Sequence, residues 1–338
     1  MHKNNFDFLR LCFAISVVLT HSYHLSSQLD NDWMHSLTNG QFSLSYIGVR
    51  GFFIISGYLI FQSLERSKTI LMYYKKRILR IFPGLFVALV LTVLLGFIVF
   101  DGGISDYIKT KAVWTYLPNN LSLYRLQAYI KGIFDNNPYK AVINGCLWTL
   151  PYEFSFYMFL SILFFFKEQF KKIMISIAVI AVLIGRIFFM EKLGAYGRGH
   201  VIAGSSILDL GAYFFSGSLL ASLKIESFQF NRKLILSILL LLLTVVIVSA
   251  SFEKLQYLLL PPIIIIFGAL STPYINNISS KLGDLSYGIY IYGFPIQQTL
   301  MHYFNFNHTL LTIYSVPLAI LFGAMSWHLV EKRVLRLK

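Results

Sequence analysis

The sequence predicts an all-α, polytopic membrane protein, and two observations carry this prediction. Of the 338 residues, 56% are hydrophobic and only 13% are charged, which is about half the charged fraction of a soluble domain. The chain also contains about ten apolar stretches, each close to the roughly 20 residues that a helix needs to cross a bilayer. We therefore expect residues 1–338 to form a single integral membrane domain with about ten transmembrane helices.

The predicted spans follow one another along the whole chain. They cover residues 6–25, 45–64, 81–100, 147–166, 173–190, 204–223, 234–251, 257–274, 285–304 and 310–329. Three of them are the weakest, because Arg186, Asp209 and the Pro261-Pro262 pair interrupt their apolar character. The first span lacks the small-residue cleavage site of a signal peptide, so we interpret it as a membrane anchor.

Basic residues are distributed unevenly between the connecting segments. With the amino terminus inside, the inner segments hold 19 Lys and Arg residues and the outer segments hold 8. The positive-inside rule then predicts a multi-pass protein of the cell inner (cytoplasmic) membrane with both termini cytoplasmic. Residues 101–146 become a long extracytoplasmic loop, and their length favours a lid or an acceptor-binding role.

The net charge of +14 raises the question of nucleic acid, but the basic residues lie at the ends of apolar segments. They form no basic face interleaved with exposed aromatic side chains, so we predict no nucleic-acid partner. Anionic headgroups of membrane lipids or an anionic cofactor are the expected partners. Cys12 and Cys146 are isolated and no Cys/His spacing typical of a metal site occurs, so we predict no metal ion.

The first span carries two ionisable residues on one face. His21 follows Arg10 by eleven residues, which brings it back to within roughly 20° of Arg10 and about 16 Å further along the helix axis. Ionisable groups inside a membrane are costly and indicate a functional site. The imidazole of His21 can exchange a proton near neutral pH, which makes it a candidate catalytic base.

Arg77 and Arg80 share a helix face at the inner mouth of the third span. Guanidinium groups bind phosphate in a bidentate fashion, which lysine cannot do. The pair is therefore a candidate phosphate grip, and a simple positive-inside anchor is the alternative.

Glu153 lies in the outer half of the fourth span, at the depth we assign to His21. A carboxylate there can orient the imidazole, and pairing with a basic residue of the outer loop is the alternative. Arg50 lies near the outer end of the second span and either pairs with Glu153 or contacts an acceptor. Asp209 and Arg186 are intramembrane charges that we expect to pair with each other, while the segment 283–290 is interpreted as packing.

Five blocks in order resemble the acyltransferase 3 family of integral membrane acyltransferases. They are Phe6–Arg10 with His21, Gly48 through Phe52-Phe53 to Ser56-Gly57, Arg77-x-x-Arg80 with Pro83, Trp148-Thr-Leu-x-x-Glu153 with Tyr157, and Ser286-Tyr-x-Ile-Tyr290 with Ser326–Glu331. The resemblance covers nearly the whole chain. One departure is Gly293, where many relatives carry a histidine.

The resemblance implies a membrane O-acyltransferase that moves an acyl group from a cytoplasmic acyl-CoA, usually acetyl-CoA, to a hydroxyl of an extracytoplasmic sugar or polysaccharide. No tightly bound cofactor is implied. It makes His21 the catalytic histidine with Glu153 as its polar partner, and Arg10, Arg77 and Arg80 the candidates for donor binding. Arg50, Trp148 and Tyr157 are assigned to acceptor binding or structural support.

Two questions stay open at this level. His21 either removes a proton from the sugar hydroxyl or first accepts the acyl group in a covalent relay. The rival from another class is a transporter or flippase of a lipid-linked sugar, in which the same charges line a path; we find no inverted repeat of the kind common in transporters.

The charge asymmetry generates a topology prediction. Reporter fusions after residues 70, 170, 230 and 338 should read cytoplasmic, and fusions after residues 35 and 125 should read extracytoplasmic. Paired alkaline phosphatase and green fluorescent protein fusions measure this, because each reporter is active on only one side. A cytoplasmic signal at residue 35 would reverse the orientation and the side assigned to His21.

Overall fold

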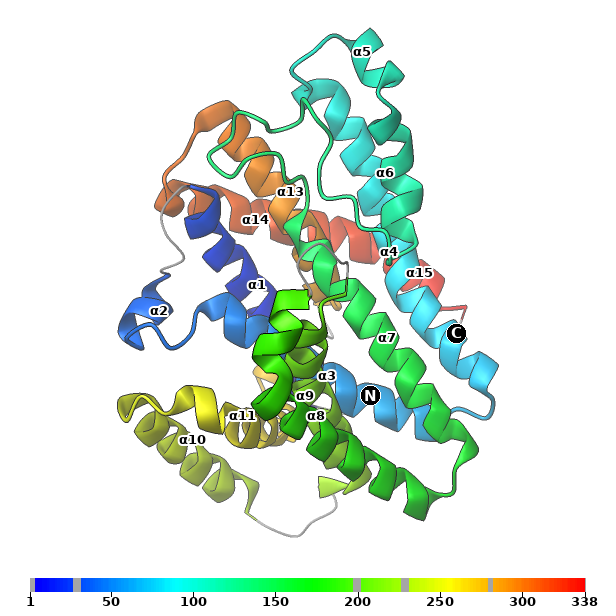
Figure 1. Cartoon of the computed structure of the whole chain (residues 1–338), viewed down its shortest axis with the longest axis vertical. Coiled ribbons are helices and arrows are strands. Elements are labelled where there is room, and N and C mark those ends of the chain that lie inside the picture. Colours follow the sequence, from blue (N-terminus) through cyan, green and yellow to red (C-terminus); the bar gives the residue numbers. More distant parts are fainter. Residues whose placement is uncertain (1–3, 27–31, 197–201, 226–230, 279–281, 338) are drawn as a thin grey trace.

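The computed structural model describes residues 4–26, 32–196, 202–225, 231–278 and 282–337. Within these ranges the secondary structure is helical, and extended pairing is limited to one isolated bridge between Phe100 and Ile133. The predicted all-α fold is therefore confirmed (Figure 1).

Each predicted span contains a long helix. These helices are α1 (Phe6–Leu25), α3 (Leu44–Glu65), α4 (Ile70–Val99), α7 (Leu150–Ser161), α8 (Glu168–Tyr196), α9 (Gly204–Ser222), α10 (Arg232–Val248), α11 (Phe252–Ala269), α13 (Ser286–Phe304) and α14 (His308–Ser326). Short elements complete the chain: α2 (Trp33–Leu37), α5 (Ile104–Lys109), α6 (Lys111–Leu121), η1 (Gly145–Thr149), η2 (Ile162–Phe165), η4 (Ile275–Asn277), η5 (Trp327–Glu331) and α15 (Lys332–Leu335).

Seven helical segments among the described residues are long and apolar enough to cross a membrane. They are Phe6–Leu25, Leu44–Glu65, Ile70–Val99, Gly145–Phe165, Glu168–Leu193, Phe252–Ala269 and His308–Leu335. The other three predicted spans form α9, α10 and α13, which fall outside that set. The number of about ten transmembrane helices therefore stays a prediction.

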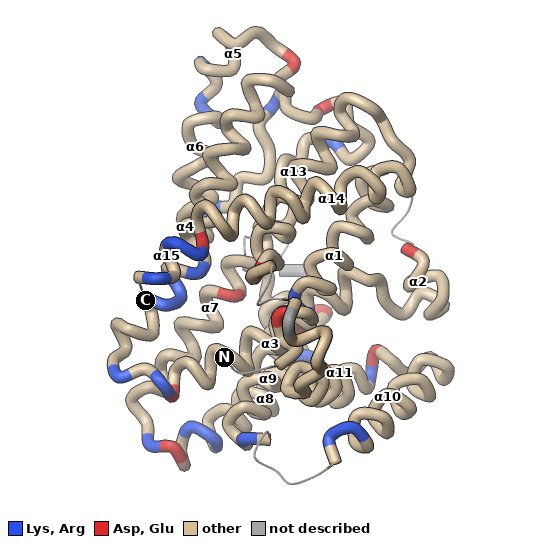
Figure 2. Tube along the Cα trace, turned by 180° about the vertical axis from the view of Figure 1, so that it is seen from behind, with Lys and Arg blue, Asp and Glu red and all other residues tan. Residues whose placement is uncertain are grey.

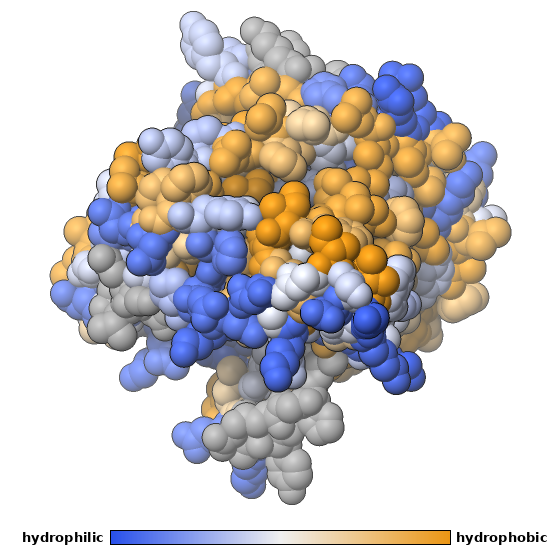
Figure 3. Space-filling view, turned by 90° about the horizontal axis from the view of Figure 1, so that it is seen from above, coloured by the Kyte–Doolittle hydropathy of each residue, from blue (hydrophilic) through white to orange (hydrophobic). Residues whose placement is uncertain are grey.

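The surface of the helices agrees with a lipid environment. In the segment Glu168–Leu193 only 11% of the most apolar stretch is buried, although α8 is rich in isoleucine along its length. A helix with apolar residues all round and little burial needs an apolar surrounding. Figure 2 shows that Lys, Arg, Asp and Glu gather mainly near helix ends and leave long tan stretches between them, and Figure 3 shows broad hydrophobic areas above a hydrophilic band.

Helices α1, α3 and α9 form the centre of the bundle. α3 packs extensively against α9 and against α1, and α1 also packs on α13 and α14. The contact between α3 and α9 depends on glycine, because a Cβ at Gly57 would collide with the carbonyl oxygen of Phe214 and a Cβ at Gly217 with that of Ile54. Small residues that let helix backbones approach closely are typical of membrane bundles.

The segment 101–146 is more structured than the predicted loop. It contains α5, which lies near the end of α4, and α6, which runs alongside α4 in Figure 1. Its buried side chains Tyr116, Ile130 and Phe134 form a core with Leu89 of α4. Tyr107 links this segment to α4 by donating a hydrogen bond of 2.7 Å to the carbonyl of Val93. Its role as a lid or acceptor-binding element stays a prediction.

Candidate active site

A cavity of about 880 Å³ opens where α1, α4 and α13 begin and α3 ends. Its lining includes five basic side chains and three acidic ones. They are Arg10, Arg66, Lys76, Arg77 and Arg80, together with Asp7, Glu153 and Asp284. We call this space the donor-side cavity, after the donor-binding role predicted for Arg10, Arg77 and Arg80. The structure thus brings together the three arginines that the sequence analysis selected and adds Arg66 and Lys76.

Arg10 and Arg80 converge on one carboxylate. The Asp284 Oδ2 atom lies 2.6 Å from Nη1 of Arg10 and 2.5 Å from Nη2 of Arg80, and Arg80 also lies 3.5 Å from Glu331. Burial disfavours the charged form of Asp284, but the two guanidinium groups outweigh it and hold its pKa well below the usual range. This ion pair joins the starts of α1 and α13 to the first half of α4.

The interpretation of segment 283–290 as packing missed this role of Asp284. The available signal was a carboxylate at the end of an apolar span, where two arginines from other spans were already predicted to lie at the same level. An intramembrane or boundary charge needs a partner. Asp284 is a carboxylate of the sequence that meets this condition at the level of Arg10 and Arg80.

Arg77 differs from its two neighbours. It forms no ion pair with a carboxylate among the residues that the structure describes, and its Nη2 donates to the Ser63 hydroxyl at 3.2 Å. Its Nε is buried without a hydrogen-bond partner. The guanidinium also lies 5.9 Å from the ring centroids of Tyr73 and Tyr157. A positive charge of this kind, on a cavity wall, is available to an anionic ligand.

Glu153 lines the same cavity and is held by two hydroxyl groups. Ser56 donates to its Oε1 at 3.0 Å and Tyr157 donates a short hydrogen bond to the same atom. The Ser56 and Tyr157 hydroxyls lie 3.0 Å apart. The predicted partnership with His21 is not found, since the hydrogen bonds described for Glu153 go to Ser56 and Tyr157. Glu153 faces the donor-side cavity instead.

His21 lies in a second, smaller cavity of about 170 Å³, which we call the His21 cavity. The Nδ1 atom of His21 lies 3.9 Å from the Sγ atom of Cys146, and its ring contacts Phe294 edge-on with a centroid distance of 5.2 Å. Arg50 and Trp148 line the same space, and the Trp148 side chain is 42% exposed. The structure therefore separates the predicted site residues into two neighbouring groups.

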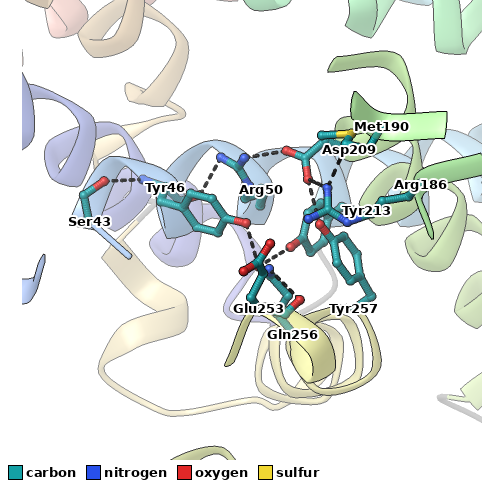
Figure 4. A network of polar contacts seen from close by, with 10 residues as sticks. All are labelled: Ser43, Tyr46, Arg50, Arg186, Met190, Asp209, Tyr213, Glu253, Gln256 and Tyr257. Carbon is teal, nitrogen blue, oxygen red and sulfur yellow. Dashed lines mark hydrogen bonds and ion pairs between the residues drawn. The ribbon is translucent and has the colours of Figure 1, made fainter. Parts of the chain in front are cut away.

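Arg50 forms a buried network rather than the predicted pair with Glu153 (Figure 4). Its guanidinium forms an ion pair with Asp209, which also lies 2.9 Å from Nη1 of Arg186 and accepts a hydrogen bond of 2.8 Å from Tyr257. The prediction that Arg50 pairs with Glu153 is thus wrong, because α3 packs beside α9 and the Asp209 carboxylate is nearer. The predicted pairing of Asp209 with Arg186 is confirmed.

The Asp209 network keeps an excess of positive charge beside His21. Two arginines share one carboxylate, so one positive charge is not neutralised within the trio. The Arg50 guanidinium carbon lies 3.3 Å from the ring centroid of Tyr46, and the Tyr46 hydroxyl in turn donates to Gln256 at 2.7 Å. Arg50 is therefore held in one place while it lines the His21 cavity.

Comparison with known proteins identifies the family. The acyltransferase domain characteristic of the acyltransferase 3 family matches residues 3–327. The chain belongs to this family. The five ordered sequence blocks predicted this membership, and it favours an acyltransferase over the transporter or flippase alternative.

Two relatives match over nearly their full length. An O-acetyl transferase of Shigella phage Sf6 is 30% identical over 345 positions, which cover 99% of this chain and 97% of that protein. Nodulation protein 10 of Rhizobium leguminosarum bv. viciae is 27% identical, and the match covers 100% of this chain and 94% of that protein. No solved structure matches the chain.

The ion pairs of Asp284 generate a stability prediction. Replacing Asp284 with Asn removes the carboxylate from two largely buried arginines, whose side chains are 20% and 16% exposed. Among the described residues, the change leaves Arg10 without a carboxylate partner and Arg80 with Glu331 alone. The cost should be lower than the roughly 3–5 kcal/mol of a fully buried broken pair, because solvent screens the partly exposed side chains. We expect a clear fall in the thermal unfolding temperature in detergent, measured by intrinsic fluorescence.

The matched control is Asp106→Asn, because Asp106 is an exposed aspartate of α5. It should leave the unfolding temperature nearly unchanged. An Asp284→Asn protein as stable as the Asp106→Asn protein would contradict the assigned role.

Proposed function

We propose that this membrane acyltransferase transfers an acetyl group from acetyl-CoA, bound in the donor-side cavity, to a hydroxyl of a glycan that reaches the His21 cavity. One observation carries the proposal. The donor-side cavity and the His21 cavity adjoin, and both are lined by Val49 and Tyr290. A donor held by its phosphates on one side can thus present its thioester to a histidine on the other side.

The donor-side cavity fits the charge of a coenzyme A thioester. Arg77 offers a guanidinium without a carboxylate partner among the described residues, and Arg66 and Lys76 line the same space. Arginine forks bind phosphate groups in a bidentate fashion. Arg10 and Arg80 are already paired with Asp284, so we assign the strongest phosphate contact to Arg77. The two paired arginines then shape the cavity wall.

The chemistry needs one proton acceptor at the acceptor hydroxyl. The neutral imidazole of His21 removes the hydroxyl proton while the sugar oxygen attacks the thioester carbonyl. A new C–O bond forms, the C–S bond breaks, and the coenzyme A thiolate takes a proton back from the imidazolium. Arg50, with its excess positive charge beside this cavity, lies where it can stabilise the developing oxyanion.

The orientation follows from the charge asymmetry of the sequence. We propose that the donor-side cavity opens to the cytoplasm, where acyl-CoA is made, and that the His21 cavity faces the extracytoplasmic side of the inner membrane. The exposed Trp148 and the serines at 43 and 45 then give the acceptor an aromatic surface and hydroxyl groups. The O-acetyl transferase name of the phage Sf6 relative supports acetyl as the group transferred.

Replacing His21 with Ala should abolish the transfer. Because a positioned acid–base group contributes about 10²–10⁴-fold, we expect at least about a hundredfold loss. His21→Asn should fail as well, since an amide hydrogen-bonds but does not exchange the proton. Glu153→Gln should cost less, because Glu153 does not contact His21. The measurement is incorporation of labelled acetyl into glycan in membranes supplied with acetyl-CoA.

The matched control is His328→Ala, which removes an exposed histidine near the end of α14. It should retain wild-type activity. A folded His21→Ala protein that still acetylates glycan would exclude both the general-base step and the covalent relay. A labelled acetyl group trapped on His21 without acceptor would replace direct transfer with the relay.

Replacing Arg77 with Lys should raise the KM for acetyl-CoA about tenfold, the scale of one charge-assisted hydrogen bond. The charge remains, but the bidentate geometry and the hydrogen bond to Ser63 are lost. Initial rates over a range of donor concentrations measure the change. Lys75→Arg, an exposed position on the same helix, is the control and should keep the wild-type KM. An unchanged KM for acetyl-CoA in Arg77→Lys would exclude the phosphate contact and leave Arg77 with the role of a positive-inside anchor.

A further inference from the structure

Val49 and Tyr290 form the part of the wall that the two cavities share. Among the described residues, only Val49 of α3 and Tyr290 of α13 line both the donor-side cavity and the His21 cavity. Every other lining residue belongs to one cavity alone. A group that passes directly from the donor-side cavity to the His21 cavity therefore passes beside these two residues.

Tyr290 is held firmly in this wall. Its hydroxyl and the Thr149 hydroxyl lie 2.8 Å apart, and its ring meets Phe52 edge-on with centroids 5.8 Å apart. The residue is only 8% exposed. Since Thr149 and Phe52 belong to the donor-side cavity, the ring is fixed from that side.

Val49 is fixed through its backbone. It follows Gly48, whose close approach to α1 is so tight that a Cβ there would lie 2.8 Å from the carbonyl oxygen of Phe13. Val49 itself is 9% exposed. Because the backbones of α3 and α1 are already in close contact at this level, α3 cannot move closer to α1.

The space beyond the wall is small. The His21 cavity measures about 170 Å³, whereas pockets for drug-sized ligands measure about 300–1,000 Å³. The donor-side cavity, at about 880 Å³, falls within that larger class. A short acyl group fits beside His21 together with an acceptor hydroxyl, and each further methylene competes for the same room.

We propose that Val49 and Tyr290 determine the acyl-chain length that the enzyme transfers, favouring acetyl over butyryl. The thioester end of the donor passes between the two side chains, and a chain of four carbons overlaps the Val49 methyl groups or the Tyr290 ring. This inference rests on the proposed function, since it requires that the donor be an acyl-CoA held in the donor-side cavity. It assigns to these residues a role in specificity, separate from proton transfer.

The experiment compares two donors in one preparation. Membrane vesicles from cells that carry the full-length protein, opened to admit the donors, supply their own glycans as acceptors. They receive radiolabelled acetyl-CoA or butyryl-CoA, and the readout is the ratio of butyryl to acetyl incorporated into glycan. A ratio measured within one variant does not depend on how much folded protein the membrane contains.

We expect Val49→Ala to raise the butyryl-to-acetyl ratio about tenfold, the lower end of the effect of one methylene in an apolar pocket. Val49→Ile adds a methylene to the wall and should lower the ratio below the wild-type value. Tyr290→Leu removes the ring and should raise the ratio. The control is Leu59→Ala, an aliphatic residue of the same helix that lines only the donor-side cavity, and it should leave the ratio unchanged.

The outcomes separate this inference from the proposed function. If the wild-type protein incorporates acetyl but both Val49 variants keep the wild-type ratio, the assignment of acyl-chain selection is overturned and the proposed function stands. A shift in Leu59→Ala as large as that in Val49→Ala would also overturn it. If the wild-type protein incorporates no acetyl from acetyl-CoA, the proposed function itself is overturned.

Discussion

The arrangement of the donor-side cavity depends on the ion pairs that the Asp284 carboxylate forms with two arginines. It binds Arg10 of α1 and Arg80 of α4 at once, so it joins three parts of the chain that lie far apart in sequence. Without it, two guanidinium groups would repel each other in a poorly hydrated space. Asp284 and Glu331 together balance the charges of Arg10 and Arg80. Arg77 has only the Ser63 hydroxyl as its hydrogen-bond partner among the described residues. The ion pairs that join the helices therefore also determine which arginines of the cavity already have a carboxylate partner.

A second cluster repeats this arrangement near His21, with a different charge balance. Asp209 lies between Arg50 and Arg186 as Asp284 lies between Arg10 and Arg80. The cluster around Asp284 gains a second carboxylate from Glu331, whereas the cluster around Asp209 is completed by tyrosine hydroxyls such as that of Tyr257. One cluster is close to neutral and the other retains a positive charge. The retained positive charge therefore lies beside His21, and not beside the Asp284 cluster that joins α1, α4 and α13.

Sequence patterns predicted the helices and selected three arginines that line one cavity, but they missed Asp284 and did not give the partners of the charged residues. The predicted spans correspond to helices, because the hydrophobicity of about 20 consecutive residues is a local property of the chain that the sequence shows directly. Depth along a span can also be counted, and it placed Arg77 and Arg80 at one end with Arg10. The pairing of Arg50 was wrong because it depends on which helices are neighbours, and the approach of α3 to α9 is set by Gly57 and Gly217 rather than by hydropathy. Glu153 and His21 were assigned one depth, yet they face different cavities, since depth does not specify the direction of a side chain.

The length of α4 has a consequence for the surroundings of the cationic residues. With 30 residues, the helix is about 45 Å long, while the hydrocarbon core of a bilayer is about 30 Å thick. Its apolar stretch begins after Arg80, so the first three turns extend beyond the hydrocarbon into the headgroup layer. Lipid phosphates in that layer are competing anions for Lys76 and Arg77, and their density varies with the proportion of anionic lipid. Under the proposed function, the lipid composition of the membrane therefore affects how readily the cavity binds a phosphorylated donor.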